Sequence, residues 1–239
     1  MDLDPELAAL GALGGFFVLH TGVPPRDALP TLARAYAPEH PAAPCGPRAD
    51  PLTVRVRRVA RSLGAPEERV AASIAHQGLA ARLWSVALGC AALYGCLPDL
   101  DPRLLHWDPD GGAPDDLWLS EVRALPVESL DTVVRADHLA PLATALTSRY
   151  RVSAGLLRGN AGSALAGAVR MVDHWARTAG RPEVAERARA LAAGLFAHPD
   201  LAGTLDPLTG RRRSCCLYYR LPGGGLCGDC CFDRPPLRG

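Results

Sequence analysis

The 239-residue chain contains no lysine and only one isoleucine, Ile74. All 26 basic side chains are therefore arginines, and 25 acidic side chains leave a formal net charge of +1 at pH 7. Because alanine, glycine, proline and arginine are abundant, the missing lysines fit a GC-rich genome and need no mechanism. A charge so close to zero, together with the lack of a basic recognition helix, predicts no nucleic-acid partner.

The sequence also lacks a long hydrophobic run and a basic leader. The most apolar stretch, Leu83 to Leu97, is roughly fifteen residues long and stops at Pro98, whereas a membrane-spanning helix needs about twenty. The chain begins with an acidic stretch, and its first basic residue is Arg26, which is unlike a secretory signal. We therefore expect no integral membrane segment and a cytoplasmic location.

The remaining composition predicts a mainly α-helical protein with a single core. Hydrophobic residues make up 48% of the chain, which is typical of a globular protein. Apolar residues on both sides of the turn Asp108–Gly112 predict a small β-hairpin at about 103–119, so an α+β class is the alternative. Helical periodicity predicts helices over 6–19, 52–63, 66–94, 136–150, 152–177 and 182–196. Asp206-Pro207 then divides a helical domain, 1–205, from a C-terminal segment, 206–239.

The C-terminal segment carries the most specific pattern in the chain. Cys215 and Cys216 are followed by ten residues, Cys227, two residues and Cys230, with a further thiol at Cys231. Pro222 and three consecutive glycines supply a turn that lets the first pair of cysteines meet the second. In a reducing compartment, such clustered thiols indicate metal or redox chemistry more often than disulfides.

Spacing alone leaves several kinds of centre open. A four-cysteine zinc site is common for motifs that contain Cys-x2-Cys, an iron–sulfur cluster is the second reading, and a dithiol redox pair is the third. Two adjacent cysteines are awkward for one small ion, because neighbouring side chains of an extended strand point to opposite faces. A two-iron cluster is larger and tolerates this splay better, which shifts the balance modestly towards iron–sulfur.

The run from Arg212 to Cys230 closely resembles the C-terminal signature of the FhuF-like ferric-siderophore reductases, and its Cys-Cys-x10-Cys-x2-Cys spacing agrees throughout. Two weaker similarities lie upstream, at 80–86 and at 157–163. The resemblance implies a [2Fe–2S] cluster held by Cys215, Cys216, Cys227 and Cys230. Cys231 has no counterpart in the motif and is either a bystander or a substitute for Cys230.

The resemblance also implies a function. The expected reaction is one-electron reduction of Fe(III) in a hydroxamate-type siderophore, which releases Fe(II) because the divalent ion binds hard oxygen ligands less tightly. The chain shows no convincing dinucleotide-binding motif, so we expect an external electron donor such as a ferredoxin. Residues 1–205 would bind the chelate, with Arg82, Trp84 and Asn160 as candidate contacts. The basic run Arg211, Arg212 and Arg213 is the candidate docking site for the donor.

Two other classes of function remain open at this point. A zinc-loaded centre of four cysteines would make the chain a siderophore-binding or regulatory protein without electron transfer. A cluster that only reports iron or redox status would make it a sensor, although the sequence offers no obvious output surface.

Overall fold

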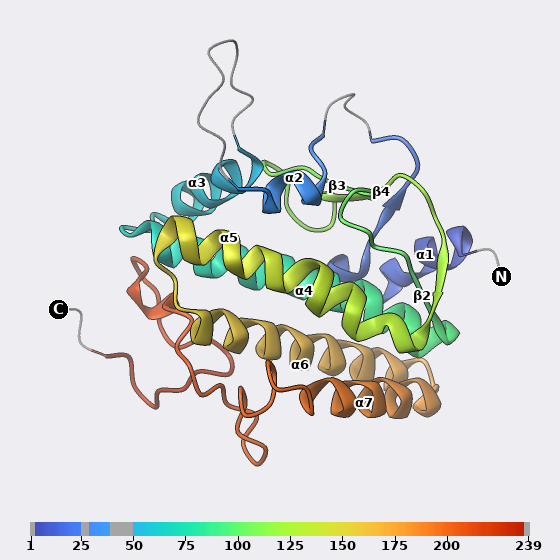
Figure 1. Cartoon of the computed structure of the whole chain (residues 1–239). Helices are drawn as coiled ribbons and strands as arrows, with labels where there is room; N and C mark the ends of the chain where they lie inside the picture. Colours follow the sequence, from blue (N-terminus) through green and yellow to red (C-terminus); the bar gives the residue numbers. More distant parts are fainter. Residues whose placement is uncertain (1–2, 25–28, 39–49, 237–239) are drawn as a thin grey trace, which may run out of the picture.

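The computed structural model describes residues 3–24, 29–38 and 50–236. Its centre is α4 (Glu68–Tyr94), a long helix that is buried on almost every side. Such all-round burial explains why its sequence is apolar without a clear polar face. Figure 1 shows α4 running through the middle of the molecule, between α5 and α6. The fold is mainly α, with 57% of the residues in helices.

Four further helices pack around α4, and the sequence predicts three of them closely. These are α3 (Pro51–Leu63), α6 (Ala154–Thr178) and α7 (Pro182–Phe196), and α4 has extensive contacts with each of them. Their ends follow from local chemistry. Asp50 caps α3 by accepting a hydrogen bond from the Thr53 amide at 2.7 Å, and Ser153 caps α6 by accepting from the Leu156 amide at 3.2 Å.

The predicted helix over 136–150 is longer in the structure and irregular at its start. A π-helix, Thr132–Leu139, leads directly into α5 (Ala140–Tyr150). Pro141 explains the change of winding, because proline lacks an amide hydrogen and interrupts the usual bonding pattern. The short helix α2 (Leu32–Tyr36) contacts both α3 and α5.

The prediction of one helix over 6–19 is wrong in its second half. The helix α1 spans Asp4–Leu10, and two 3-10 turns follow at Gly11–Leu13 and Gly15–Phe17. Gly14 separates the two turns with a φ of 129°, a conformation that only glycine adopts readily. The carbonyls released here are bound by Arg82 of α4, which donates to Gly15 at 2.9 Å and to Phe16 at 2.7 Å.

The expected hairpin is confirmed and is part of a small sheet. Strand β3 (Leu105–Trp107) pairs antiparallel with β4 (Leu117–Leu119), and β1 (His20–Thr21) pairs parallel with β4. A second sheet joins β2 (Cys96–Pro98) to β5 (Ala124–Pro126), which is followed by a 3-10 turn at Val127–Ser129. No helix in the described part of the chain is both long enough and apolar enough to span a membrane.

A buried histidine joins the π-helix to the rest of the core. His138 is fully buried, its Nε2 donates to the Leu100 carbonyl at 2.6 Å, and its Nδ1 accepts from the Tyr36 hydroxyl at 2.8 Å. These partners require the neutral ring with hydrogen on Nε2. Burial lowers the pKa of His138 from 6.5 to about 4.

This pKa predicts acid sensitivity with a defined sign. Between pH 6.5 and about 4 the unfolded chain binds a proton at His138 and the folded chain does not, so stability falls as the pH falls through this window. His138 alone should contribute about 3 kcal/mol to the loss. Urea unfolding from pH 7 to pH 4 should show a shallower decline for His138→Gln than for the unaltered protein. An equally steep decline in the variant would assign the acid sensitivity to other groups, such as the buried His76.

Candidate metal centre

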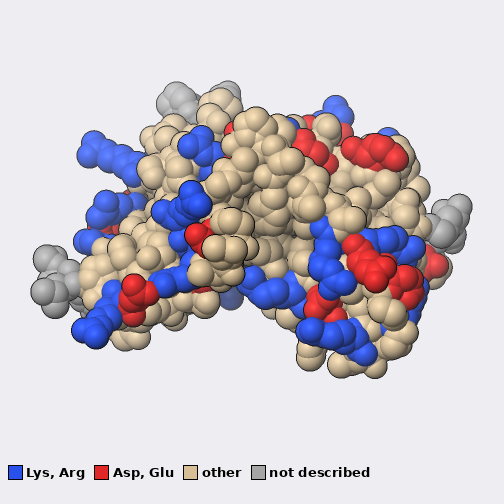
Figure 2. Space-filling model, turned by 90° about the horizontal axis from the view of Figure 1, so that it is seen from below, with Lys and Arg blue, Asp and Glu red and all other residues tan. Residues whose placement is uncertain are grey.

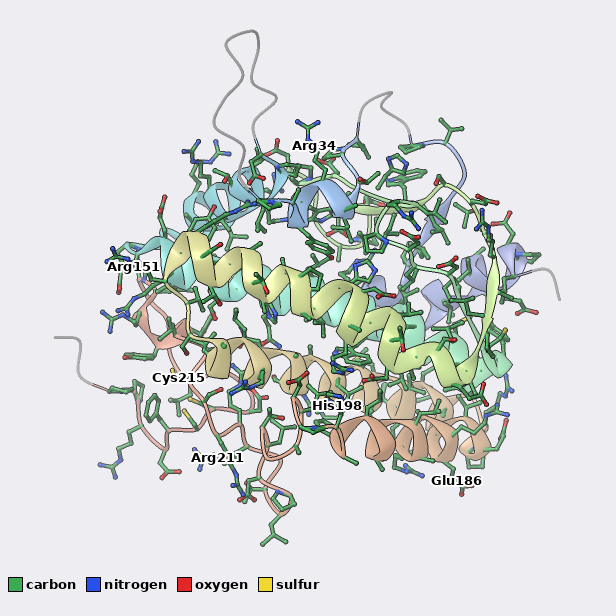
Figure 3. The ribbon with its side chains drawn as sticks, viewed as in Figure 1. Arg34, Arg151, Glu186, His198, Arg211 and Cys215 are labelled. Carbon is green, nitrogen blue, oxygen red and sulfur yellow. The ribbon has the colours of Figure 1, made fainter. Side chains whose placement is uncertain are left out.

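The cysteines lie on an irregular C-terminal segment that folds back against α4 and α6; residues 206–236 are called the cysteine segment below. Its only helical part is a 3-10 turn, Tyr218–Arg220. Figures 1 and 3 show the segment beneath the beginning of α6, with Cys215 and Arg211 both on it. Backbone hydrogen bonds fix its path, since the Arg213 amide donates to Thr204 and the Arg212 amide donates to Asp229, both at 2.9 Å.

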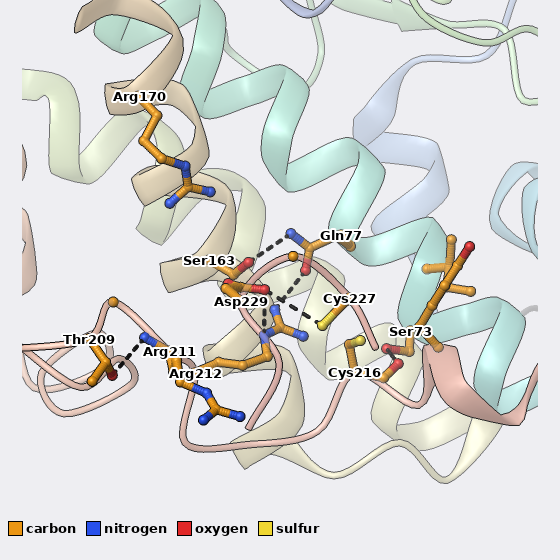
Figure 4. Close-up of a pocket in the computed structure, with 14 residues that line it drawn as sticks. Ser73, Gln77, Ser163, Arg170, Thr209, Arg211, Arg212, Cys216, Cys227 and Asp229 are labelled. Carbon is orange, nitrogen blue, oxygen red and sulfur yellow. Dashed lines mark hydrogen bonds and ion pairs between the residues drawn. The ribbon is translucent and has the colours of Figure 1, made fainter. Parts of the chain in front are cut away.

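The folding of the segment brings its thiols together. Cys216 acts directly on the pKa of Cys227, and Figure 4 shows their sulfur atoms side by side. Cys215 interacts in the same way with Cys216, Cys230 and Cys231. Burial and these neighbouring thiols raise the pKa of Cys215 to about 11 and also raise the pKa of Cys227, with burial the larger cause. The unloaded protein therefore holds these groups as neutral thiols until a metal displaces their protons.

Backbone amides are directed at two of the sulfur atoms. The Leu217 amide lies 3.3 Å from Cys215 Sγ, and the Phe232 amide lies 3.5 Å from Cys230 Sγ. Leu217 reaches this position with a φ of 68°, in the left-handed region, which costs about 1 to 3 kcal/mol for a residue other than glycine. Amide hydrogens near sulfur are one means by which a protein sets a cluster's potential.

Arg212 anchors the cysteine segment to both long helices. Its guanidinium is buried and donates to Gln77 Oε1 of α4 at 3.0 Å, to Asn160 Oδ1 of α6 at 3.1 Å and to the Gly159 carbonyl at 3.2 Å. Nε of the same side chain lies 3.5 Å from Asp229 Oδ1, between the third and fourth cysteines of the motif. The positive charge also favours the thiolate form of Cys227 and so opposes part of the rise in its pKa.

Asn160 and Ser73 complete this anchor. The Asn160 amide donates to the Ser73 carbonyl at 2.9 Å and to Ser73 Oγ at 3.1 Å. Ser73 Oγ donates in turn to the carbonyl of Cys216 at 2.8 Å. The polar side chains of the two helices thus connect Arg212 with the backbone of the second cysteine of the motif.

The donor set fits a sulfur-ligated cluster better than a single ion. In residues 3–24, 29–38 and 50–236, no three His, Cys, Asp or Glu side chains converge closely enough to hold one metal ion. The thiols instead form two neighbouring groups, Cys216 with Cys227 and Cys215 with Cys230 and Cys231, an arrangement that suits a larger centre containing two irons. Thiolate ligands are also the soft donors that iron–sulfur clusters use.

A cavity of about 720 Å³ opens directly beside the thiols. Cys216 and Cys227 are part of its wall, and helices α4 and α6 form the facing side (Figure 4). A volume of this size suits a small-molecule ligand, for which pockets of about 300 to 1,000 Å³ are usual. The remaining lining residues are Ser73, Ile74, Gln77, Ser163, Arg170, Thr209, Gly210, Arg211, Arg212, Tyr218, Gly228 and Asp229.

Residues 212–232 match the family model described as the FhuF 2Fe-2S C-terminal domain. The matched stretch contains the whole cysteine motif and confirms the resemblance there. It identifies the cofactor as a [2Fe–2S] cluster and leaves the zinc alternative without support. No curated protein matches the chain.

The other predicted contacts lie in different surroundings. Arg82 is buried beneath the small sheet, where it forms an ion pair with Asp116 at 2.9 Å, and Trp84 is completely buried. Neither lines the cavity beside the thiols, so their roles in substrate binding stay predictions that the geometry does not favour. Asn160 is adjacent to the cysteine segment, but it is buried and serves Arg212 and Ser73.

The three arginines of the predicted docking site lie in different environments. Arg211 donates to the Cys230 carbonyl at 2.7 Å and pairs with Asp233 at 2.5 Å, while Arg213 is exposed. Arg212 is buried and cannot present its charge to a partner. Figure 2 shows basic and acidic side chains interspersed on the face seen from below, without a uniform basic surface.

Sequence reasoning missed Ser73, Gln77, Ser163 and Arg170, which line the cavity from α4 and α6. One signal was available, because Ser73 and Gln77 are spaced by four residues and Ser163 and Arg170 by seven, so each pair shares a helix face. Nothing in the sequence indicates that these two faces meet at the cysteines.

A glycine of α6 sets how closely the cysteine segment approaches. A Cβ atom at Gly159 would lie 1.9 Å from Ser214 Oγ, next to the first cysteine. We expect Gly159→Ala to lower the free energy of unfolding by about 1 to 3 kcal/mol through overpacking and to weaken cluster retention. Gly155→Ala is the matched control on the same helix, since nothing lies within 4 Å of its added Cβ, and it should be neutral or stabilising.

The double variant Gly159→Ala, Ser214→Ala tests the cause of this effect. Removing Oγ leaves the Ser214 Cβ as the nearest atom, 3.3 Å away, so most of the lost stability should return. Thermal unfolding of all three variants is the measurement. A double variant no more stable than Gly159→Ala would show that the close approach at Ser214 is not the reason.

Cysteine variants can distinguish whether Cys231 is a bystander or a substitute ligand. Its thiol interacts with those of Cys215 and Cys230, so it lies among the candidate ligands. We expect Cys231→Ser to retain normal iron and sulfide, Cys230→Ser to retain part of both, and the double variant to lose them. Visible absorption with iron and sulfide analysis would measure this. A colourless Cys230→Ser protein that still folds would make Cys231 a bystander.

Proposed function

We propose that this chain is a ferric-siderophore reductase in which Cys215, Cys216, Cys227 and Cys230 hold the [2Fe–2S] cluster. The observation that supports this most directly is that the cavity and the metal centre share two residues. Cys216 and Cys227 belong to both, so a chelate in the 720 Å³ space would lie against the cluster ligands without an intervening helix. When bound, the cluster supplies electrons one at a time.

In this proposal the residues around the thiols have separate tasks. The amides of Leu217 and Phe232 direct hydrogen towards sulfur, which favours the more negative, reduced form of the site. Arg212 adds a buried positive charge and fixes the segment between α4 and α6. Gln77, Ser163 and Thr209 present amide and hydroxyl groups to the oxygen atoms of a hydroxamate chelate.

The electron balance requires a separate donor. One electron from a reduced one-electron carrier, such as a ferredoxin, converts one Fe(III) chelate into an Fe(II) chelate, from which the iron dissociates. We assign donor docking to Arg213, which is exposed, and Arg211, which borders both Cys230 and the cavity. Free thiols at each described cysteine suit a reducing, cytoplasmic setting for this reaction.

Anaerobic reduction and reoxidation of the purified protein test the proposal. Iron and labile sulfide should each approach about two per chain, as a [2Fe–2S] cluster requires. Dithionite should bleach the visible bands, and after the excess dithionite is removed a ferric hydroxamate should restore them while an Fe(II)-specific dye develops colour. The gallium(III) complex of the same chelator is the control, because it has the same shape and cannot accept the electron. Bleached protein that stays bleached with every ferric chelate would contradict the reductase and favour a sensor.

A further inference from the structure

One arginine at the rim of the cavity has no partner of its own among the described residues. Arg170 lies on α6 two turns after Ser163, so the two side chains share a face of the helix. Its Nη2 atom lies 3.8 Å from the position of a Cβ on Gly167, which shows that the side chain runs back along the helix towards Ser163. Figure 4 shows the Arg170 guanidinium directed from α6 towards the cavity.

The other charges of the cavity wall are already compensated. Arg212 is paired with Asp229, and Arg211 with Asp233, at 3.5 Å and 2.5 Å respectively. Within the described ranges, no carboxylate or carbonyl binds Arg170, and its side chain is exposed. The wall therefore carries one uncompensated positive charge, and that charge is at the entrance.

Among the described lining residues, Arg170 is the one unpaired positive charge, whereas the loaded cluster held by Cys216 and Cys227 adds negative charge to the same wall. Gln77 and Ser163 contact each other across the two helices at 3.4 Å, and Thr209 adds a hydroxyl from the loop. These neutral groups can bind hydroxamate or amide oxygens of any chelate, whatever its total charge. Discrimination in favour of a negatively charged chelate would then depend on Arg170.

We propose that the cavity prefers ferric chelates that carry a free carboxylate, and that Arg170 is the residue that selects them. This inference rests on the proposed function and specifies its substrate class: an iron-loaded hydroxamate with a net negative charge is preferred over a neutral or cationic one. An exposed guanidinium interacting with one carboxylate changes affinity by about three- to tenfold. Position favours a chelate over an acidic donor protein as the partner of Arg170, because the side chain lines the same cavity as Cys216 and Cys227.

A series of chelators that differ in one terminal group isolates the effect of charge. Desferrioxamine B has a free amine, its N-acetyl derivative is neutral, and its N-succinyl derivative ends in a carboxylate, while the three hydroxamates that hold the metal are unchanged. Binding of the three gallium(III) complexes to the cluster-loaded protein is measured by isothermal titration calorimetry. The succinyl complex should bind about three- to tenfold more tightly than the acetyl complex, and the amine complex most weakly.

Two variants assign this preference to its residue. Arg170→Gln should remove most of the difference among the three complexes by weakening the succinyl complex. Arg177→Gln is the matched control, because Arg177 is on the same helix, its side chain is 70% exposed, and it lies outside the cavity wall while changing the net charge equally. Its three affinities should equal those of the unaltered protein.

Several outcomes would overturn the inference. Equal affinities for the three complexes, no binding of any of them, or an unchanged preference in Arg170→Gln would each do so. Unchanged chelate affinities combined with weaker binding of a reduced ferredoxin would assign Arg170 to donor docking instead. Because gallium(III) is not reduced, the charge preference is measured independently of catalysis. If the three gallium complexes bind in the expected order but the protein does not reduce the matching ferric complexes, the charge preference stands and the proposed reductase function is wrong.

Discussion

The burial of Arg212 is the constraint on which the metal centre depends. A guanidinium removed from water must find several acceptors, and this one finds them on α4 and α6 and forms an ion pair with Asp229 across the cysteine segment. Leaving such a group without partners typically costs about 3 to 5 kcal/mol. The irregular segment has almost no secondary structure of its own, and this side chain holds it in position together with the Ser73 bond to Cys216 and the backbone bonds of Arg212 and Arg213.

The two helices can supply those acceptors because polar residues interrupt an otherwise apolar interface. Ser73 and Gln77 lie on α4, and Asn160 lies opposite on α6, so three polar side chains replace hydrophobic packing at one end of the helix pair. Farther along α4, Arg82 does the same for the N-terminal turns and the hairpin through Asp116. The central helix thus serves as core and as support for two loop regions that could not pack by themselves.

The helices and the cysteine motif could be predicted from the sequence, but the place where the cysteine segment packs against the helices could not. Periodicity and capping residues such as Asp50 and Ser153 located the helices because both signals are local. The thiol spacing is likewise local, and its prediction is supported by the match over residues 212–232. The partners of Arg212 and the free charge of Arg170 depend on which helix faces meet, a tertiary property that a single sequence does not encode in any short pattern. The same limit explains why Arg82, an arginine in an apolar helix, was predicted to contact a ligand although it binds loop carbonyls.

Arg212 also lowers the cost of negative charge at the thiols, since it favours ionisation of Cys227. One guanidinium therefore acts as both tether and counter-ion. During evolution these two properties cannot change independently. A substitution of Arg212 that alters the redox potential also weakens the anchoring of the cysteine segment. A neutral side chain that restores the packing still changes the potential. Related chains should consequently adjust their potentials through the amides of Leu217 and Phe232 or through the more exposed Arg211, where the electrostatic effect can change and the anchor remains.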